Sequence, residues 1–283
     1  MATEIQTTAP TGTGQSKDVA DYIHDADLPD LPPAVRTLFE EYSKIPAAEV
    51  QPHVLQLRER AWQIFPYPCI GRLRFLDFSL STMPSYDKIL SSLSSKEDPK
   101  TLMDVGCCFG QDLRKLLLDG APGSQLVGVE LKPEFIDMGY DLFMDRKTYQ
   151  GRFVTGDFFE DTTGSAMKSL DGTIDILHIA SFLHIFGWDE QVRAAVRLMG
   201  FLKNKPGTII LGRQLGSSKP GEYRHPAGVV GVTYSHDEET FQKLWTEVEK
   251  KTTTKWKIEA NLKKVPTKGS TLELLYFEAT RTE

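Results

Sequence analysis

Apolar residues recur at helical spacing in the first part of the chain and gather into short runs in the rest. The stretch 1–30 is polar, rich in Thr and Gly and without a sustained apolar period, which is typical of a disordered tail. In 31–45 and 50–63, apolar side chains recur at the spacing of one face of an amphipathic helix. A further helix is predicted over 86–93, and we therefore expect the segment 31–98 to form a helical cap.

The pattern changes in the segment 99–283, where short continuous apolar runs alternate with helical patterns. Such runs are typical of strands that are buried on both faces of a parallel sheet. The predicted strands are 102–105, 125–131, 152–156, 174–180 and 208–212, and the predicted helices between them are 111–118, 133–143, 165–170 and 189–202. Two β-rich runs, 256–264 and 271–280, predict a terminal hairpin. The expected fold is α/β: a doubly wound, seven-stranded, mostly parallel sheet with an antiparallel C-terminal hairpin and an N-terminal helical cap.

The connection between the fifth strand and the hairpin carries two further signals. Residues 212–233 are rich in glycine and contain prolines, so we expect a long substrate loop there. Ser235 begins the sequence Ser-His-Asp-Glu, which has the form of a capping box and predicts a helix that extends to about residue 250.

Charge and composition exclude several classes of protein. The formal net charge of −6 and the lack of a dense basic patch argue against a nucleic-acid partner. No apolar run approaches the roughly 18 residues of a membrane-spanning helix, and the N-terminus lacks the basic and apolar regions of a secretory signal. The 3 cysteines, an odd number, form no disulfide framework and suit a reducing compartment. We expect a cytoplasmic protein.

The loop after the first predicted strand has the form Asp-x-Gly-x-x-x-Gly, from Asp104 to Gly110. Ligands of doubly wound sheets bind beyond the carboxyl ends of the strands, so this loop is the first place to look for a cofactor. Gly106 permits a tight turn, and Gly110 lets the next helix pack closely against the strand. A dinucleotide site has a glycine where this chain has Cys108, so the pyrophosphate fingerprint is absent. A carboxylate at the strand end favours an ammonium group instead, as in the amino-acid part of S-adenosylmethionine.

Acidic residues also end the next two strands. Glu130 follows the second strand at the place where a carboxylate accepts hydrogen bonds from ribose hydroxyls. Asp157 and Phe158 follow the third strand, where a carboxylate can accept the exocyclic amine of adenine and a ring can stack on the base. The expected cofactor-binding residues are Asp104, Gly106, Cys107, Gly110, Glu130, Leu131, Asp157, Phe158 and Ser181.

The glycine loop, the acids that follow it and the Lys-Pro-Gly turn at 205–207 resemble the class I S-adenosylmethionine-dependent methyltransferases. More specifically, five segments resemble fungal methyltransferases of meroterpenoid gene clusters: 67–72, 107–116, 139–143, 182–188 and 212–214. The resemblance runs from about residue 66 to the C-terminus. It implies methylation of a carboxyl group on a polyketide–terpenoid intermediate, which gives a methyl ester, by a homodimer.

Two residues are candidates for the chemistry. His184, in the loop after the fourth strand, is a candidate base or hydrogen-bonding anchor, with a structural histidine as the alternative. Arg213 follows the fifth strand, where its guanidinium can hold a carboxylate, with an ordinary surface ion pair as the alternative. The aromatic residues Trp62, Phe65 and Tyr67 of the cap are expected to form a lid over the site. His178 is expected to be a core residue, and no metal site is expected because no ligand spacing is present.

Three alternative functions remain open at this point. A hydroxyl acceptor, unlike a carboxylate, would require a general base such as His184. A nicotinamide-dependent oxidoreductase is disfavoured by the incomplete glycine fingerprint. The third alternative is a noncatalytic protein that binds the cofactor or another subunit, because such a protein would have the same sequence features. The partner expected for the enzyme is a small carboxylic acid.

Overall fold

The computed structural model describes residues 31–160, 162–224, 231–267 and 270–283. The predicted disordered tail, 1–30, lies outside the described residues. A seven-stranded sheet runs through the molecule in the order β3-β2-β1-β4-β5-β9-β8, and β9 is antiparallel to both of its neighbours. The strands are β1 (Leu102–Val105), β2 (Leu126–Glu130), β3 (Arg152–Thr155), β4 (Ile176–Ala180), β5 (Ile209–Leu215), β8 (Trp256–Thr267) and β9 (Ser270–Arg281). The predicted fold class is confirmed.

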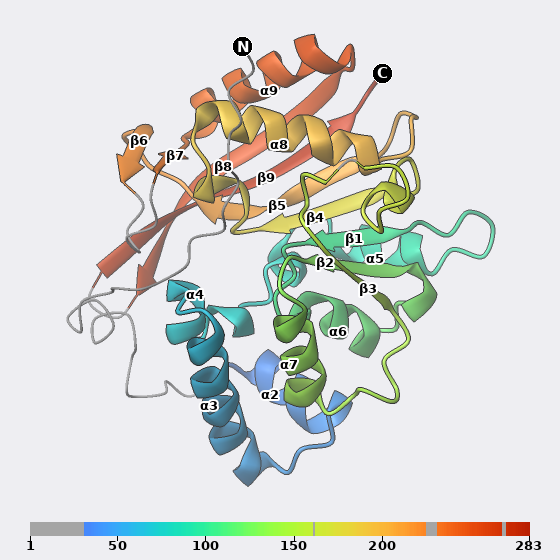
Figure 1. Cartoon of the computed structure of the whole chain (residues 1–283), viewed down its shortest axis with the longest axis vertical. Helices are drawn as coiled ribbons and strands as arrows, with labels where there is room; N and C mark the ends of the chain where they lie inside the picture. The colour runs from blue at the N-terminus through green and yellow to red at the C-terminus, as the bar shows by residue number, and fades with distance from the viewer. Residues whose placement is uncertain (1–30, 161, 225–230, 268–269) are drawn as a thin grey trace.

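Helices cover both faces of the sheet. Helices α8 (Trp188–Phe201) and α9 (Glu238–Thr252) lie on one face, and α5 (Tyr86–Leu93), α6 (Gln111–Leu118) and α7 (Pro133–Phe143) lie on the other (Figure 1). Apolar side chains fill the space between each layer of helices and the sheet. Strands β1 and β4 occupy the middle of the sheet, so their side chains are enclosed from both sides.

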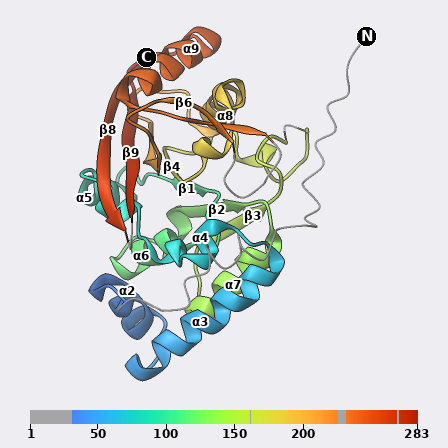
Figure 2. The same cartoon turned by 90° about the vertical axis from the view of Figure 1, so that its left-hand side faces the viewer.

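The cap packs on the helical layer formed by α6 and α7. It contains α2 (Pro33–Thr37), the π-helix η1 (Leu38–Tyr42), α3 (Ala47–Ile64), α4 (Pro68–Gly71) and two 3₁₀ turns, η2 (Arg74–Leu76) and η3 (Leu80–Thr82). Helix α3 lies alongside α7 in both views of the molecule (Figures 1 and 2). The cap has no core of its own, because its apolar residues share a cluster with Phe109, Phe135 and Phe143 of the sheet domain.

Three predictions about individual elements are wrong. The segment predicted as a helix over 165–170 contains only the 3₁₀ turn η5 (Lys168–Leu170). The predicted long loop over 212–233 is partly regular, because β5 continues to Leu215 and a two-stranded sheet of β6 (Gly221–Arg224) and β7 (Val232–Ser235) follows; residues 225–230 lie outside the described part. Ser235 ends β7 and does not cap α9: Asp237 is the capping residue.

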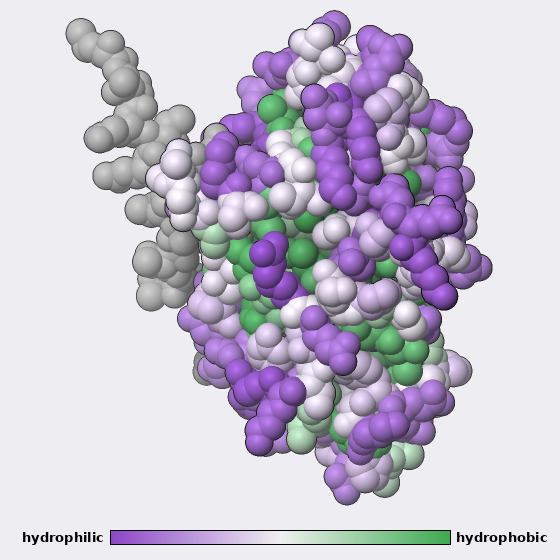
Figure 3. Space-filling view, turned by 90° about the vertical axis from the view of Figure 1, so that its right-hand side faces the viewer, coloured by the Kyte–Doolittle hydropathy of each residue, from purple (hydrophilic) through white to green (hydrophobic). Residues whose placement is uncertain are grey.

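The exterior is mainly polar on the face shown in Figure 3, where hydrophilic residues dominate and hydrophobic residues gather in small patches between them. Among the described residues, no helix combines the length and apolar character needed to cross a membrane.

Candidate active site

The predicted cofactor loop joins β1 to α6 and has a tightly turned backbone. Gly106 and Gly110 have φ angles of +69° and +68°, in the left-handed region that favours glycine. A Cβ atom on Gly110 would lie 2.6 Å from Nη1 of Arg114 and 2.9 Å from the ring of Phe153, so a larger residue would force these side chains to shift. Cys108 also has a positive φ angle, of 52°, which costs a non-glycine residue some conformational energy. The loop therefore depends on its surroundings to hold this shape.

Glu130 ends β2 and fastens the loop from the side. Its Oε2 accepts a hydrogen bond from the backbone N–H of Cys108 at 3.0 Å, and its Oε1 accepts one from the N–H of Lys132 at 3.1 Å. Burial raises the pKa of Glu130, although these N–H donors lower it in part. A carboxylate has about four lone-pair sites, so Glu130 can still accept hydrogen bonds from a ligand. Next to it, the apolar side chain of Leu131 is 54% exposed.

Asp157 and Phe158, after β3, have different accessibilities. Asp157 is exposed, and its Oδ1 accepts a hydrogen bond from the N–H of Phe159 at 2.9 Å. Phe158 is only 7% exposed, and its ring packs edge-on against those of Phe159 and Phe182. The carboxylate is thus open to a ligand, whereas the stacking of Phe158 on adenine stays a prediction.

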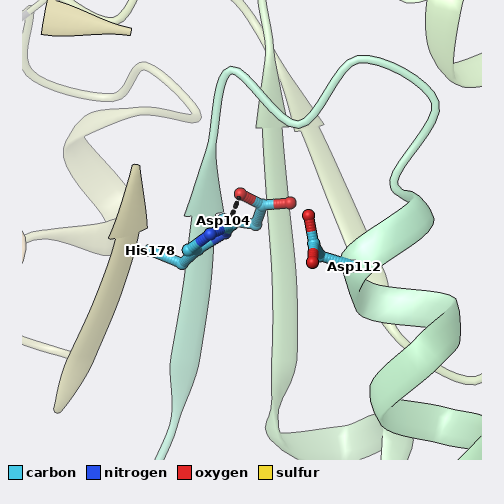
Figure 4. A group of neighbouring side chains, drawn as sticks. All are labelled: Asp104, Asp112 and His178. Carbon is cyan, nitrogen blue, oxygen red and sulfur yellow. Dashed lines mark hydrogen bonds and ion pairs between the residues drawn. The ribbon is translucent and has the colours of Figure 1, made fainter. Parts of the chain in front are cut away.

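Asp104 lies beneath the cofactor loop, inside the protein. Its Oδ1 lies 2.8 Å from Nδ1 of His178, the residue beside it on β4. Asp112, in the first turn of α6, approaches the same place, and Figure 4 shows the three side chains converging. Their potential ligand atoms lie within 4.8 Å of one another. Sequence spacing gave no sign of this cluster, because its members come from β1, α6 and β4.

The part of the site that is predicted to meet the substrate lies around the end of β4 and the second half of β5. Arg213 lies inside β5 and does not follow that strand as predicted, because β5 continues to Leu215. Ser181 follows β4 with a positive φ angle of 52°, and its N–H donates to the carbonyl of Arg213 at 2.7 Å. Nη2 of Arg213 lies 3.1 Å from Oδ2 of Asp77 in the cap, and Nε of Arg74 lies 3.0 Å from the same oxygen. Two guanidinium groups therefore hold one carboxylate here. Asp77 was not predicted as a site residue, because nothing in the sequence connects it to β5.

His184 lies in the 3₁₀ turn η6 (Leu183–Ile185), between β4 and α8, and is partly buried. This position follows the carboxyl end of β4, as predicted for a residue near the acceptor. Its role as a base or as a structural residue stays a prediction.

Aromatic residues of the cap reach the predicted cofactor side of the sheet. The rings of Phe65 and Tyr67 are 4.1 Å apart, Tyr67 contacts Phe135 of α7, and Nζ of Lys132 lies 5.3 Å from the centre of the Phe65 ring. Burial raises the pKa of Tyr67 to about 12, and the nearby charge of Glu130 adds to the increase. The cap thus lies against the turn that carries Glu130, the place where a lid is expected.

The sheet order, the glycine loop after β1 and the acid at the end of β2 define a class I methyltransferase fold. The structure is similar to that of CurJ carbon methyltransferase, with a TM-score of 0.51 and 12% identity over 88% of this chain and 70% of that one. S-adenosylmethionine is the methyl donor of this class.

Sequence comparisons then identify the family. O-methyltransferase atr3 of Stereocaulon alpinum is 40% identical over 83% of this chain and 67% of its own length. O-methyltransferase phiE of a fungal species (strain ATCC 74256) is 39% identical over 88% of this chain and 85% of its own. Residues 22–76 match the model of the meroterpenoid methyltransferase N-terminal domain. The chain belongs to this family of fungal methyltransferases, and the predicted class of enzyme is confirmed.

Proposed function

We propose that this chain transfers a methyl group from S-adenosylmethionine to a carboxyl oxygen of a polyketide–terpenoid intermediate, forming a methyl ester in fungal secondary metabolism. One observation carries the carboxyl assignment: Arg74 and Arg213, a residue inside β5, converge on a single carboxylate oxygen, that of Asp77. Guanidinium groups pair with carboxylates through charge-assisted hydrogen bonds, so this part of the site has the chemistry that recognises an acid. The match of residues 22–76 to a meroterpenoid methyltransferase domain supports the substrate class.

The residues around the glycine loop fit the cofactor. Glu130 has lone pairs available for ribose hydroxyls, the exposed side chain of Leu131 offers an apolar surface to a purine, and Asp157 is an exposed acceptor for its amine. Gly106 and Gly110 bring the backbone close to the ligand. Cys107, within the loop, is buried, and Ser181 directly follows β4, on the acceptor side.

The chemistry makes few demands on the protein. The bound cofactor supplies an electrophilic methyl group on a sulfonium. A carboxyl group with an ordinary pKa near 4 is ionised at neutral pH, so this acceptor needs no base. Arg213 orients the acid, and the cap excludes water. Positioning of this kind can supply on the order of 7–11 kcal/mol of the barrier reduction.

The function is tested by label transfer. The full chain is incubated with methyl-labelled S-adenosylmethionine and a panel of aromatic and terpenoid carboxylic acids, with the matching alcohols and phenols in parallel. We expect label only with the acids, in a product that alkali hydrolyses as a methyl ester. Label confined to the alcohols or phenols would reject the carboxyl assignment.

Two measurements separate the remaining alternatives. S-adenosylhomocysteine should raise the melting temperature, whereas NAD should not; stabilisation by NAD alone would indicate an oxidoreductase. Replacing the candidate base, His184→Gln, should spare most of the activity toward acids, whereas a loss of several orders of magnitude would favour a hydroxyl acceptor. Binding without any transfer across the panel would indicate a noncatalytic protein.

We also propose that the enzyme is a homodimer and acts in the cytoplasm. Light scattering on the purified chain tests the first point, since a dimer has twice the mass of the chain. A fluorescent fusion in the producing fungus tests the second.

A further inference from the structure

The cofactor loop is bracketed by two buried acids that are tied to a single residue of the cap. Asp104 precedes the loop, and its Oδ1 lies 2.8 Å from Nδ1 of His178. Asp112 follows the loop, and its Oδ2 accepts a hydrogen bond from Oγ of Ser79 at 3.2 Å. The same Oγ lies 2.8 Å from Nε2 of His178. The backbone N–H of Leu80, the next residue of the cap, donates to Oδ1 of Asp112 at 2.9 Å.

This relay of Asp104, His178, Ser79 and Asp112 is closed to solvent. The exposed fractions are 3% for Asp104, 0% for His178, 2% for Ser79 and 2% for Asp112. The order carboxylate, imidazole, hydroxyl is that of a serine hydrolase, but a buried hydroxyl cannot meet a substrate. Both ring nitrogens of His178 are already bonded to protein atoms, so the imidazole needs no metal ion to satisfy it. The relay therefore has a role within the protein structure and does not contact a substrate.

Counting hydrogens shows that the relay retains one extra proton. The Nδ1–H of His178 donates to the Asp104 carboxylate. Two hydrogen bonds remain, one between Nε2 of His178 and Oγ of Ser79 and one between that Oγ and Oδ2 of Asp112. These two hydrogen bonds need two hydrogens, and the Ser79 hydroxyl supplies only one of them. Either His178 is an imidazolium and Asp112 is ionised, or His178 is neutral and Asp112 is protonated. Both arrangements carry the same net charge, and loss of the proton removes one hydrogen bond.

We propose that Ser79 and His178 are positioning residues for cofactor binding: through this relay, the seated cap holds both ends of the loop 106–110 in the shape that accepts the cofactor. The physical reason is that the loop contains the strained residue Cys108 and needs support from outside. A fully satisfied buried network rigidifies its members, whereas a partly satisfied one is costly. The inference rests on the proposed cofactor site.

The first test removes one hydroxyl. In Ser79→Ala, the relay is broken between His178 and Asp112, so the Kd for S-adenosylhomocysteine, measured by calorimetry on the full chain, should rise at least about tenfold. The matched control is Ser85→Ala in the same cap, because the Ser85 hydroxyl is buried without a hydrogen-bond partner among the described residues. The control should bind like the wild type, with a similar melting temperature. Equal affinity in all three proteins would overturn the inference.

The second test separates positioning from general stability. In Asp112→Asn, the amide can donate to Ser79, the Ser79 hydroxyl can then donate to Nε2, and the Leu80 N–H keeps its acceptor. This variant retains every bond and the same net charge, but it has no proton to lose. The affinity of Asp112→Asn for S-adenosylhomocysteine at neutral pH should therefore stay within about threefold of the wild-type value. Asp112→Ala should bind S-adenosylhomocysteine more weakly, because it removes these hydrogen bonds.

The pH profile is the decisive readout. Burial alone would lower the pKa of His178, but Asp104 and Asp112 raise it above its usual value, with Arg213 of β5 acting in the opposite direction. The proton is thus lost only as the pH rises through that raised pKa. Wild-type affinity should fall at alkaline pH more steeply than that of Asp112→Asn, and the ligand's own titration cancels in this comparison. Identical profiles would contradict the relay. If the wild type bound no S-adenosylhomocysteine, the proposed function itself would fail.

Discussion

At the scale of single residues, Arg114 is a charged side chain that is fully enclosed, with an exposed fraction of 0%. Its Nε and Nη2 donate to the two oxygens of Asp145 at 2.9 and 3.0 Å, and its Nη1 donates to the carbonyl of Phe109 at 2.7 Å. The guanidinium carbon lies 4.5 Å from the centre of the Tyr149 ring. Tyr42 of the cap donates to the same Asp145. The pair of Arg114 and Asp145 therefore connects α6, the segment after α7 and the cap.

Replacing this arginine should be strongly destabilising. In Arg114→Leu, Asp145 stays buried without its cation, and we expect the free energy of unfolding to fall by about 3–5 kcal/mol, measured by urea denaturation. The neighbouring Lys115 forms an ion pair nearer the surface, with Asp119. Its replacement, Lys115→Ala, serves as the control and should cost no more than about 1 kcal/mol. Similar losses in both variants would show that the Arg114 pair adds no special stability.

His236 should make the fold sensitive to acid. Burial lowers the pKa of His236 to about 4, because the ring is enclosed between Thr240 and Gln191. Its unfolded pKa is near 6.5, so the stabilisation is present above pH 6.5 and is lost as the pH falls toward 4. At pH 5 the loss should be about 2 kcal/mol relative to pH 7.5.

Urea denaturation at the two pH values measures this loss. The variant His236→Gln removes the titrating group, so its stability should change less between the same pH values. An equal change in the variant and the wild type would assign the acid sensitivity to other groups.

The sequence predicts some site residues and misses others for a physical reason. Asp104, Glu130 and Asp157 could be singled out from the sequence because each lies within two residues of the end of a strand whose apolar run is clear. Asp77 and Ser79 were not, because their partners lie on strands distant in sequence and no local pattern records such pairs. His178 was rightly expected to be buried, but its hydrogen bonds depend on the register of β1 and β4.

At the scale of elements, long periodic segments were predicted well. The predicted bounds of β1, α6 and α7 agree with the structure, since apolar periodicity and a clear start or stop coincide there. The prediction over 165–170 failed because that segment is too short for a stable helix without tertiary support. The loop predicted after Gly212 failed because β5 is extended by pairing with β9, a strand far along the chain.

The start of α9 allows a direct test of the corrected capping residue. Asp237 Oδ1 accepts a hydrogen bond from the N–H of Thr240 at 2.8 Å, and the Thr240 hydroxyl accepts one from the N–H of Asp237. Asp237→Ala should therefore lower the melting temperature, corresponding to about 1 kcal/mol of stability. Ser235→Ala, at the residue predicted from sequence, should have little effect. The reverse order in thermal unfolding would restore the original prediction.

At the scale of the whole molecule, the cap and the sheet domain share one apolar cluster. The ring of Phe109, in the cofactor loop, packs edge-on against Phe75 of the cap and Phe135 of α7. Ligand binding at the loop should therefore also stabilise the cap. The cap helices were predicted from their periodicity, but their dependence on α7 was not, because periodicity does not show what covers an apolar face.

Hydrogen exchange measures this coupling. On addition of S-adenosylhomocysteine, amides in the cap segment 65–80 should exchange more slowly, because binding stabilises the seated form. Amides at the far end of the sheet, in the β8–β9 hairpin, serve as the internal control and should change little. Slower exchange confined to the loop would mean that the cap is indifferent to the ligand.

The shared cluster also has a consequence for biosynthesis. A ribosome releases the cap first, yet the aromatic residues that cover its apolar face, Phe135 and Phe143, emerge only with α7. Until then the nascent cap exposes side chains such as Phe39 and Leu38 to the cytosol. The completed helix α7 thus sets the earliest moment at which the cap can bury its apolar face, and chaperones that bind apolar chains can act before then.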